Sequence, residues 1–261
     1  MSKTIKQRLA EPGLIRVMAV GRAMHHNLLQ IVGVQGGYHG FWIDFEHIGI
    51  GVQDTEIAAM AARAHGMDTF CRIPPTDYAL VTRCLETGAS GVMAAQIFSA
   101  AQAEEFVRWA KFAPRGMRGL NVGGIDAGFA RQPIPEFIKS ANEKTFVAIQ
   151  IETKEALEEC EAIAAIDGVD LLFVGPSDLS QHLGHPGDFL HETNLAALDR
   201  VAAACRNAGK HWGAVCITPE HAHVMLEKGV KMLSPASDVK LINAGLAGVQ
   251  SAFAELFQDG I

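Results

Sequence analysis

Two acidic residues stand directly after short, apolar, β-rich runs. The run Phe146–Ile151 leads into Glu152, and the run Leu171–Ser177 leads into Asp178. The two acids are 26 residues apart, which is close to the length of one strand–helix–strand unit. If both runs are parallel strands of one sheet, the two carboxylates lie at the same edge of that sheet.

This pair of acids has two interpretations. Carboxylate oxygens are the ligands that hard divalent cations prefer, so the pair predicts a metal site. Acids are also favoured at helix starts, and Glu152 precedes the helical segment Thr153–Leu157, while Asp178 is placed to cap a helix. These residues alone leave both interpretations open.

A cationic and a titratable side chain follow other strand-like runs. Arg72 ends one run, and His47 follows another together with Asp44. Arg72 is expected to face negative charge that develops on a substrate, and His47, oriented by Asp44, to move a proton near neutral pH. With a metal, this set suits chemistry through an enolate. Each residue also has an alternative interpretation. Arg72 could pair with Asp44 or Glu46 in an ion network, and His47 could be a partly buried histidine that is hydrogen-bonded to the backbone.

Gln150 precedes Glu152 by two positions. The period of a strand is two, so both side chains point to the same face of the sheet. A Gln and a Glu that faced a covering helix layer would be buried without partners. We therefore expect both to face the interior of the barrel.

Eight β-rich runs alternate with Ala-rich segments of helical period, several of which stop at a glycine. Strands that are apolar on both faces suit a parallel sheet covered by helices. Eight such units in 261 residues predict a (β/α)8 TIM barrel, in the α/β class, that forms a single domain over residues 1–261. The predicted strands are Val17–Val20, Gly40–Phe45, Thr69–Ile73, Gly91–Ile97, Phe146–Ile151, Leu171–Gly175, Trp212–Ile217 and Lys231–Ser234. The predicted helices are Thr55–His65, Asp77–Thr87, Ala100–Phe112, Lys154–Ile166, Leu195–Ala208, Pro219–Lys228 and Asp238–Phe257.

One connection interrupts this alternation. Pro114–Thr145 is long, rich in Gly, Pro and Arg, and weakly periodic, so we expect an irregular and functional loop. Neither a G-x-G-x-x-G nor a G-x-x-x-x-G-K-[ST] motif is present, which argues against a dinucleotide or P-loop fold.

The composition excludes several classes of protein. The net charge is −7 with no Lys/Arg run, which argues against nucleic-acid and anionic-membrane binding. The sequence contains neither an apolar stretch of bilayer length nor a signal peptide. Its five cysteines are odd in number and form no C-x-x-C pair, so we expect reduced thiols in a cytoplasmic protein.

Five segments in this order resemble the HpcH/HpaI aldolase and citrate lyase family of the phosphoenolpyruvate/pyruvate barrel superfamily. The resemblance covers roughly residues 30–250, and the I-E-T and G-P-x-D-L-S segments are its most specific parts. The segments are Trp42–His47, Cys71–Pro74, Pro114–Gly119, Ile149–Thr153 and Val174–Ser180.

The resemblance implies a class II, metal-dependent pyruvate aldolase, which is a carbon–carbon lyase. It would reversibly cleave a 4-hydroxy-2-oxo acid to pyruvate and an aldehyde through a metal-bound pyruvate enolate. Glu152 and Asp178 would hold Mg²⁺, Mn²⁺ or Co²⁺, and His47 with Asp44 would form the acid/base pair. Arg72 would stabilise the enolate oxygen. The implied substrate-binding set is Arg72, Gln150, Pro176, Ser177 and Asp178.

The resemblance also implies a homo-hexamer, a trimer of dimers, in which the last helix, Asp238–Phe257, is exchanged between subunits. The loop Pro114–Ala130 would then help to shape a site at a subunit boundary. The chain departs from the family pattern in its first and fourth strands, so the aldehyde partner stays open. A citrate-lyase-like acyl-CoA lyase and a non-catalytic ligand-binding barrel are the alternatives.

Overall fold

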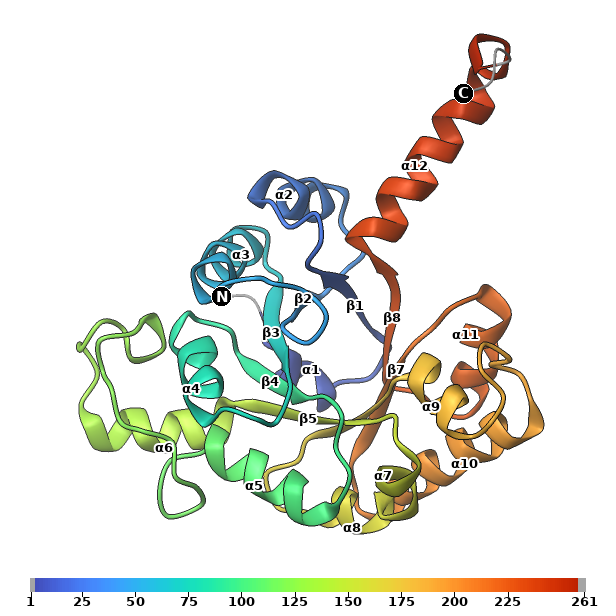
Figure 1. Ribbon diagram of the computed structural model, residues 1–261. Coiled ribbons are helices and arrows are strands. Elements are labelled where there is room, and N and C mark those ends of the chain that lie inside the picture. The colour runs from blue at the N-terminus through green and yellow to red at the C-terminus, as the bar shows by residue number, and fades with distance from the viewer. Residues whose placement is uncertain (1–2, 258–261) are drawn as a thin grey trace.

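Eight parallel strands close into a barrel in this computed structural model, which describes residues 3–257 (Figure 1). Each strand pairs with the next along the chain, and the last strand pairs with the first. The predicted (β/α)8 TIM barrel is therefore confirmed; residues 1–2 and 258–261 of the predicted domain lie outside the described residues. The strands are β1 (Ile15–Val20), β2 (Gly40–Asp44), β3 (Asp68–Ile73), β4 (Gly91–Ala94), β5 (Phe146–Ile151), β6 (Leu171–Val174), β7 (His211–Val215) and β8 (Met232–Ser237).

Helices cover the outside of the barrel, and most lie where the sequence predicts them. The predicted helix Lys154–Ile166 is two shorter helices that meet at Glu159. The predicted helix Asp238–Phe257 ends at Ala252 and continues as a 3-10 turn, Ala254–Phe257. The corresponding helices are α3 (Val52–Ala64), α4 (Tyr78–Glu86), α5 (Ala100–Ala110), α7 (Lys154–Glu158), α8 (Cys160–Ala165), α10 (Glu192–Asn207), α11 (Pro219–Glu227) and α12 (Asp238–Ala252).

The prediction of an irregular loop over Pro114–Thr145 is wrong in its second half, which contains a helix. Pro133 and Pro135 suit the start of that helix, where a backbone N–H lacks an intrahelical partner. Its buried Phe137 packs edge-on against Phe112, with ring centroids 5.3 Å apart. The helices that the sequence analysis did not predict are α1 (Ile5–Leu9), α2 (His26–Gln35), α6 (Ile134–Lys144) and α9 (Pro176–His182), together with a 3-10 turn at Ile125–Ala127.

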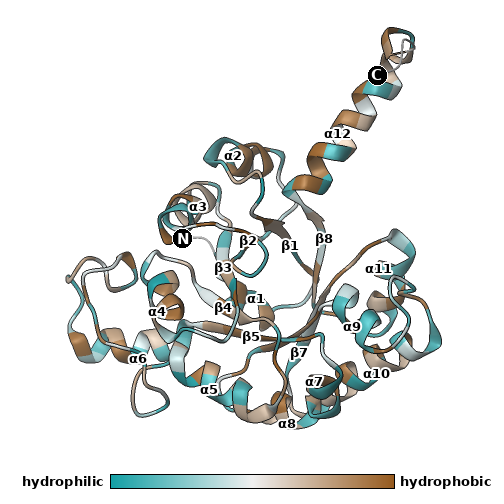
Figure 2. Cartoon of the chain, in the orientation of Figure 1, coloured by the Kyte–Doolittle hydropathy of each residue, from teal (hydrophilic) through white to brown (hydrophobic). Residues whose placement is uncertain are grey.

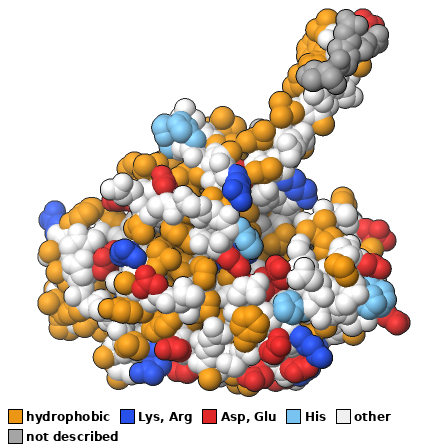
Figure 3. All heavy atoms as spheres, viewed as in Figure 1, with side chains coloured by type: hydrophobic (Ala, Val, Ile, Leu, Met, Phe, Trp, Pro, Cys, Tyr) orange, Lys and Arg blue, Asp and Glu red, His pale blue; other side chains and the backbone are white. Residues whose placement is uncertain are grey.

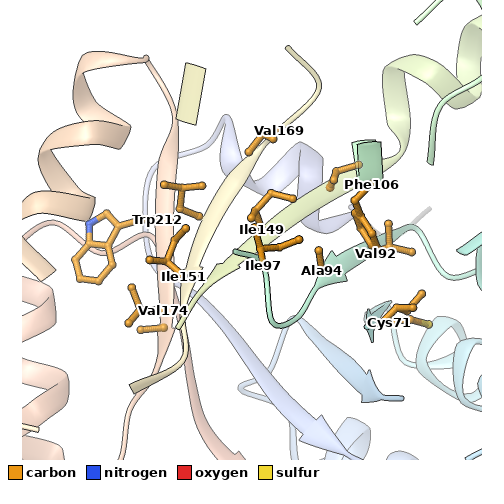
Figure 4. Close-up of a cluster of buried hydrophobic side chains, with 14 of the residues drawn as sticks. Cys71, Val92, Ala94, Ile97, Phe106, Ile149, Ile151, Val169, Val174 and Trp212 are labelled. Atoms are coloured by element: carbon orange, nitrogen blue, oxygen red, sulfur yellow. The ribbon is translucent and has the colours of Figure 1, made fainter. Parts of the chain in front are cut away.

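Two apolar cores lie on the two sides of the sheet. The outer core joins strand residues to the helices; Figure 4 shows a part of it, with Val92 of β4 beside Phe106 of α5 and Ile151 of β5 beside Val174 of β6. The inner core fills the barrel and includes Ile5 and Leu9 of α1, so that α1 closes the end at which the strands begin. The opposite end, where the strands finish, is left for a site.

The helix α12 projects from the end of β8 as an arm (Figure 1), and apolar residues recur along it (Figure 2). Among its residues only Asp238 is buried. No helix within residues 3–257 has the length and apolar character that crossing a membrane requires. All five cysteines are buried, unpaired thiols.

Candidate active site at the carboxyl ends of the strands

The guanidinium of Arg72 is the centre of a buried ion network. Its Nε and Nη2 donate to the two oxygens of Asp44 at 3.1 and 2.8 Å, and its Nη1 lies 3.1 Å from Oε2 of Glu46. The group also lies over the ring of Trp42, 4.9 Å from the ring centroid. Strands β2 and β3 pair with Asp44 opposite Arg72, which brings the two side chains together. The ion network that the sequence left open as an alternative role for Arg72 is therefore present.

Asp44 positions the following turn through the backbone. Its Oδ1 accepts the N–H groups of Glu46 and His47. Burial alone would raise the pKa of Asp44, but the bonds and charge of Arg72 and these two N–H groups lower it below its usual value. The His47 ring is 56% exposed, with Nε2 3.7 Å from Glu46 Oε2. Asp44 thus orients His47 through its main chain, and Glu46 is the acid nearest to the ring.

Glu152 is completely buried just beyond the end of β5. Its Oε1 accepts the backbone N–H of Gln96 at 2.7 Å, and its Oε2 accepts from Nε2 of Gln150 at 2.5 Å. Burial raises the pKa of this carboxyl to about 7, and the charges of Glu46 and Asp178 act in the same direction. Gln150 is buried as well, as expected for two residues that share the inner face of a strand.

Two residues that the sequence analysis left without a role shape the surroundings of Glu152. Gln96 has a left-handed backbone, with φ of 47°, and this unusual conformation aims its N–H at the carboxylate. A side chain at Gly175 would clash with the Glu152 carboxylate and would lie 2.6 Å from Nε2 of Gln150. The glycine of the G-P-S-D segment was the sequence signal for this close approach.

Helix α9 begins two residues after β6 ends, and Asp178 lies in its first turn. The interpretation of Asp178 as a helix-start acid therefore holds. It is also electrostatically coupled to the site, because its charge raises the pKa of both Glu46 and Glu152. The two interpretations are therefore compatible for Asp178. Glu152 lies before α7, whose N-cap is Thr153.

The donor set of this site fits a divalent cation. Arg72 is the cation near Asp44, Glu46 and Glu152, and the charge of Asp178 also acts on Glu46 and Glu152. Within residues 3–257, the buried Oε1 of Gln150 has no hydrogen-bond partner. Such an excess of acid is costly in a buried site unless protons or a cation neutralise it. Within residues 3–257, however, no cluster of three His, Cys, Asp or Glu side chains could hold a metal. A cation here would therefore take two protein carboxylates and complete its shell with water or substrate, as Mg²⁺ commonly does.

A cavity of about 380 Å³ opens beside this network, between β1, β2, β7 and β8. Asp44 and His47 line it, so they form the boundary between the carboxylates and the cavity. In Figure 3, acidic and histidine atoms lie near each other on the visible face, below the base of the α12 arm. The remaining cavity wall includes Trp42, Val215 and Ala236 and is largely apolar.

Comparison with known proteins places the chain in a family. The model of the family described as HpcH/HpaI aldolase/citrate lyase matches residues 24–244. A 2-dehydro-3,6-dideoxy-6-sulfogluconate aldolase of Pseudomonas putida is 34% identical over 215 residues, which are 79% of this chain and 81% of that protein. A hydroxypyruvate/pyruvate aldolase of Paraburkholderia phytofirmans is also 34% identical, over 78% of this chain and 80% of its own length.

The fold comparison agrees. The crystal structure of an HpcH/HpaI aldolase from Desulfitobacterium hafniense superposes with a TM-score of 0.89 and 28% identity, covering 95% of this chain and 96% of that one. Relatives named as aldolases together with the family match identify the enzyme class as carbon–carbon lyase. The chain belongs to the HpcH/HpaI aldolase/citrate lyase family.

Proposed function

We propose that this chain is a divalent-metal-dependent aldolase that reversibly cleaves a 4-hydroxy-2-oxo acid to pyruvate and an aldehyde. The observation that carries the proposal is the buried group of carboxylates around Glu152, set beside one guanidinium and one exposed histidine. The relatives include a hydroxypyruvate/pyruvate aldolase and a 2-dehydro-3,6-dideoxy-6-sulfogluconate aldolase, and both names support a 2-oxo acid as part of the substrate.

Glu152 and Asp178 are the residues that would hold Mg²⁺, Mn²⁺ or Co²⁺. When bound, the cation supplies Lewis-acid polarisation of the 2-oxo acid. The first-turn N–H groups of Ser177 and Asp178 have no intrahelical partner and would hold the substrate carboxylate, while Pro176 at the first helical position needs no such partner. Gln150 would fix the orientation of Glu152 through their hydrogen bond.

Cleavage begins when His47 accepts the proton of the C4 hydroxyl. The C4 oxygen then forms the aldehyde carbonyl as the C3–C4 bond breaks, and that electron pair becomes the C2–C3 double bond of the enolate. Arg72 stabilises the negative charge that develops on the C2 oxygen. Proton transfer to C3 completes pyruvate, and the reverse sequence forms the carbon–carbon bond. Asp44 and Glu46 hold Arg72 in place for this role.

Metal binding and proton exchange test this proposal. Glu152→Ala and Asp178→Ala are expected to abolish Mn²⁺ binding in calorimetry and deuterium uptake by the methyl group of pyruvate. Glu143→Ala, on the exposed face of α6, is the matched control and should behave as the wild type. Full aldolase activity after EDTA treatment would contradict the proposal. So would an enzyme that cleaves an acyl-CoA thioester but does not cleave a 4-hydroxy-2-oxo acid.

We further propose that the protein is a homo-hexamer, a trimer of dimers, in which α12 is exchanged between neighbouring subunits. Ile242, Leu246 and Val249 recur at helical spacing along α12, Phe253 caps its end, and the four side chains are 41–57% exposed. A stripe of this kind is normally covered by another apolar surface. Leu246→Asp should give smaller particles in light scattering, whereas a wild-type monomer would contradict the proposal.

We also propose a cytoplasmic location, which the five unpaired thiols support. Recovery of the protein from an oxidising compartment in cell fractionation would contradict it.

A further inference from the structure

We propose that the aldehyde partner carries a negatively charged group, and that Arg22 and Lys240 select it in the cavity beside the catalytic network. This inference rests on the proposed aldolase function, because it concerns the second substrate of that reaction. It starts from open space next to His47: the cavity of about 380 Å³ is lined by both His47 and Asp44.

The direction of the aldehyde follows from the reaction geometry. Its carbonyl oxygen must lie within reach of His47, and its carbonyl carbon must face the enolate held near Arg72 and Glu152. The rest of the aldehyde then points away from those residues. On that side lies the cavity between β1 and β8, whose volume suits a small ligand.

The acids and the cations that line the cavity differ in their hydrogen-bond partners. Asp44 is fully engaged with Arg72 and two backbone N–H groups. Asp238 is 3% exposed and accepts the N–H groups of Gly21, Ala23 and Val239 at 2.7–2.9 Å. Among the described residues, neither acid therefore forms a salt bridge with Arg22 or Lys240.

In the part of the chain that the structure describes, neither Arg22 nor Lys240 has an acidic partner. Nη2 of Arg22 donates to the carbonyl of His47 at 3.0 Å. Nζ of Lys240 donates to the carbonyls of Ile217 and Pro235 at 3.1 and 3.0 Å, which places it over the ends of β7 and β8. Within residues 3–257, neither forms a salt bridge.

Arg22 and Lys240, which donate to carbonyls, give one edge of the cavity two positive charges beside a largely apolar part of the wall. A short aldehyde with a carboxylate or sulfonate at its far end would bury its carbon chain against Trp42 and Val215 and place its charge at this edge.

Matched aldehydes test the selection directly. Aldol addition of pyruvate, with Mn²⁺ present, is measured with 4-oxobutanoate, with 3-sulfopropanal and with the neutral 4-oxobutanamide. The wild type should use at least one of the two anions with a kcat/KM about tenfold or more above that of the amide, as expected for a hydrogen bond to a charged group. Preference for one anion over the other identifies its charged group.

Variants link this preference to the two cations. Arg22→Gln combined with Lys240→Gln should reduce the ratio of acid to amide to below about threefold, mainly through a higher KM for the acid. Arg22→Lys should retain most of the preference because it keeps the charge. The control Lys139→Gln with Arg206→Gln removes the same charge from α6 and α10 and should keep the wild-type ratio. If the double variant fails to fold, the single Lys240→Gln variant replaces it.

The outcomes separate this inference from the proposed function. Deuterium exchange at the methyl group of pyruvate needs no aldehyde. Wild-type exchange without a preference for anionic aldehydes would overturn the inference and leave the aldolase function standing. Absence of exchange in the wild type would overturn both. Full anion preference in the double variant would also overturn the inference.

Discussion

The inside of the barrel has a lower and an upper layer, and β3 contributes one residue to each. Phe70 in the lower layer and Arg72 in the upper layer are two positions apart, so both face inward. Phe70 meets Phe146 edge-on, with ring centroids 5.3 Å apart. Arg72 meets Asp44 and Glu46 instead. Both side chains are buried, yet one is held by apolar contact and the other by charge.

Strand β5 repeats this division. Its inward residues change from Phe146 through Ala148 to Gln150, and Glu152 follows. Burial of apolar area stabilises the lower layer. In the upper layer, burial raises the pKa of Glu152 and so opposes its ionised form. The same strands therefore provide stability at the end closed by α1 and chemistry at the other end.

The largest expected effect on stability comes from the lower layer. Phe70→Ala removes a completely buried ring and should lower the free energy of unfolding by about 3–5 kcal/mol. Urea denaturation measures this loss. At low temperature, where the variant stays folded, kcat should remain within about threefold of the wild type, because the ring lies below the site. A loss of turnover as large as the loss of stability would contradict the separation of the two layers.

The upper layer should show the opposite pattern in Arg72→Lys. A lysine keeps the charge but cannot reach Asp44 and Glu46 with three separate nitrogens, as Arg72 does. We expect kcat to fall about 10²–10³-fold, the scale of one lost oxyanion donor. Arg72→Ala is a poorer test, because two buried acids would lose their cation, at a cost of about 3–5 kcal/mol. Unchanged proton exchange at pyruvate C3 in Arg72→Lys would contradict the role of Arg72.

The sequence predicted the two layers with different success. All eight strands were predicted because continuous apolar runs and helix-ending glycines are local signals. Inward placement of Gln150 with Glu152 followed from the period of a strand. The ion pairing of Arg72 with Asp44 and Glu46 stayed an open alternative, because it depends on how β2 pairs with β3, which the sequence does not give.

Other features of the site depend on backbone conformation and were missed. The role of Gln96 requires a left-handed backbone that its sequence does not announce, since this conformation favours glycine. Helix α6 was missed although Pro133, Pro135 and the apolar positions after them are a recognisable helix start. The role of His47 and the ligand roles of Glu152 and Asp178 remain predictions.

A smaller effect is expected from removing only the charge of Glu152. Its pKa is about 7 in the folded protein and near 4.5 in the unfolded chain, so the folded state binds more protons between these values. The free energy of unfolding therefore falls as the pH rises from about 4.5 to about 7, and the penalty is complete above that range. Without metal at pH 8, Glu152→Gln should be more stable than the wild type by up to about 3 kcal/mol.

Urea denaturation in EDTA at pH 5 and pH 8 measures this difference, which should be small at pH 5. Addition of Mn²⁺ at pH 8 should stabilise the wild type and leave the variant unchanged. Equal stability of the two proteins at both pH values would show that burial does not oppose ionisation of Glu152.

The smallest expected effect concerns the contact between the two layers. Trp42 belongs to the inner core, lies beneath the Arg72 guanidinium, and donates its Nε1–H to Oγ of Ser234 at 2.9 Å. Ser234→Ala removes the acceptor but leaves the ring in place. Both residues line the cavity, so water can replace the lost bond, and the cost should be at the low end, about 1 kcal/mol. Urea denaturation should detect this loss, with kcat within about twofold of the wild type; a fall in kcat above tenfold would show that Trp42 must be fixed by Ser234 to position Arg72.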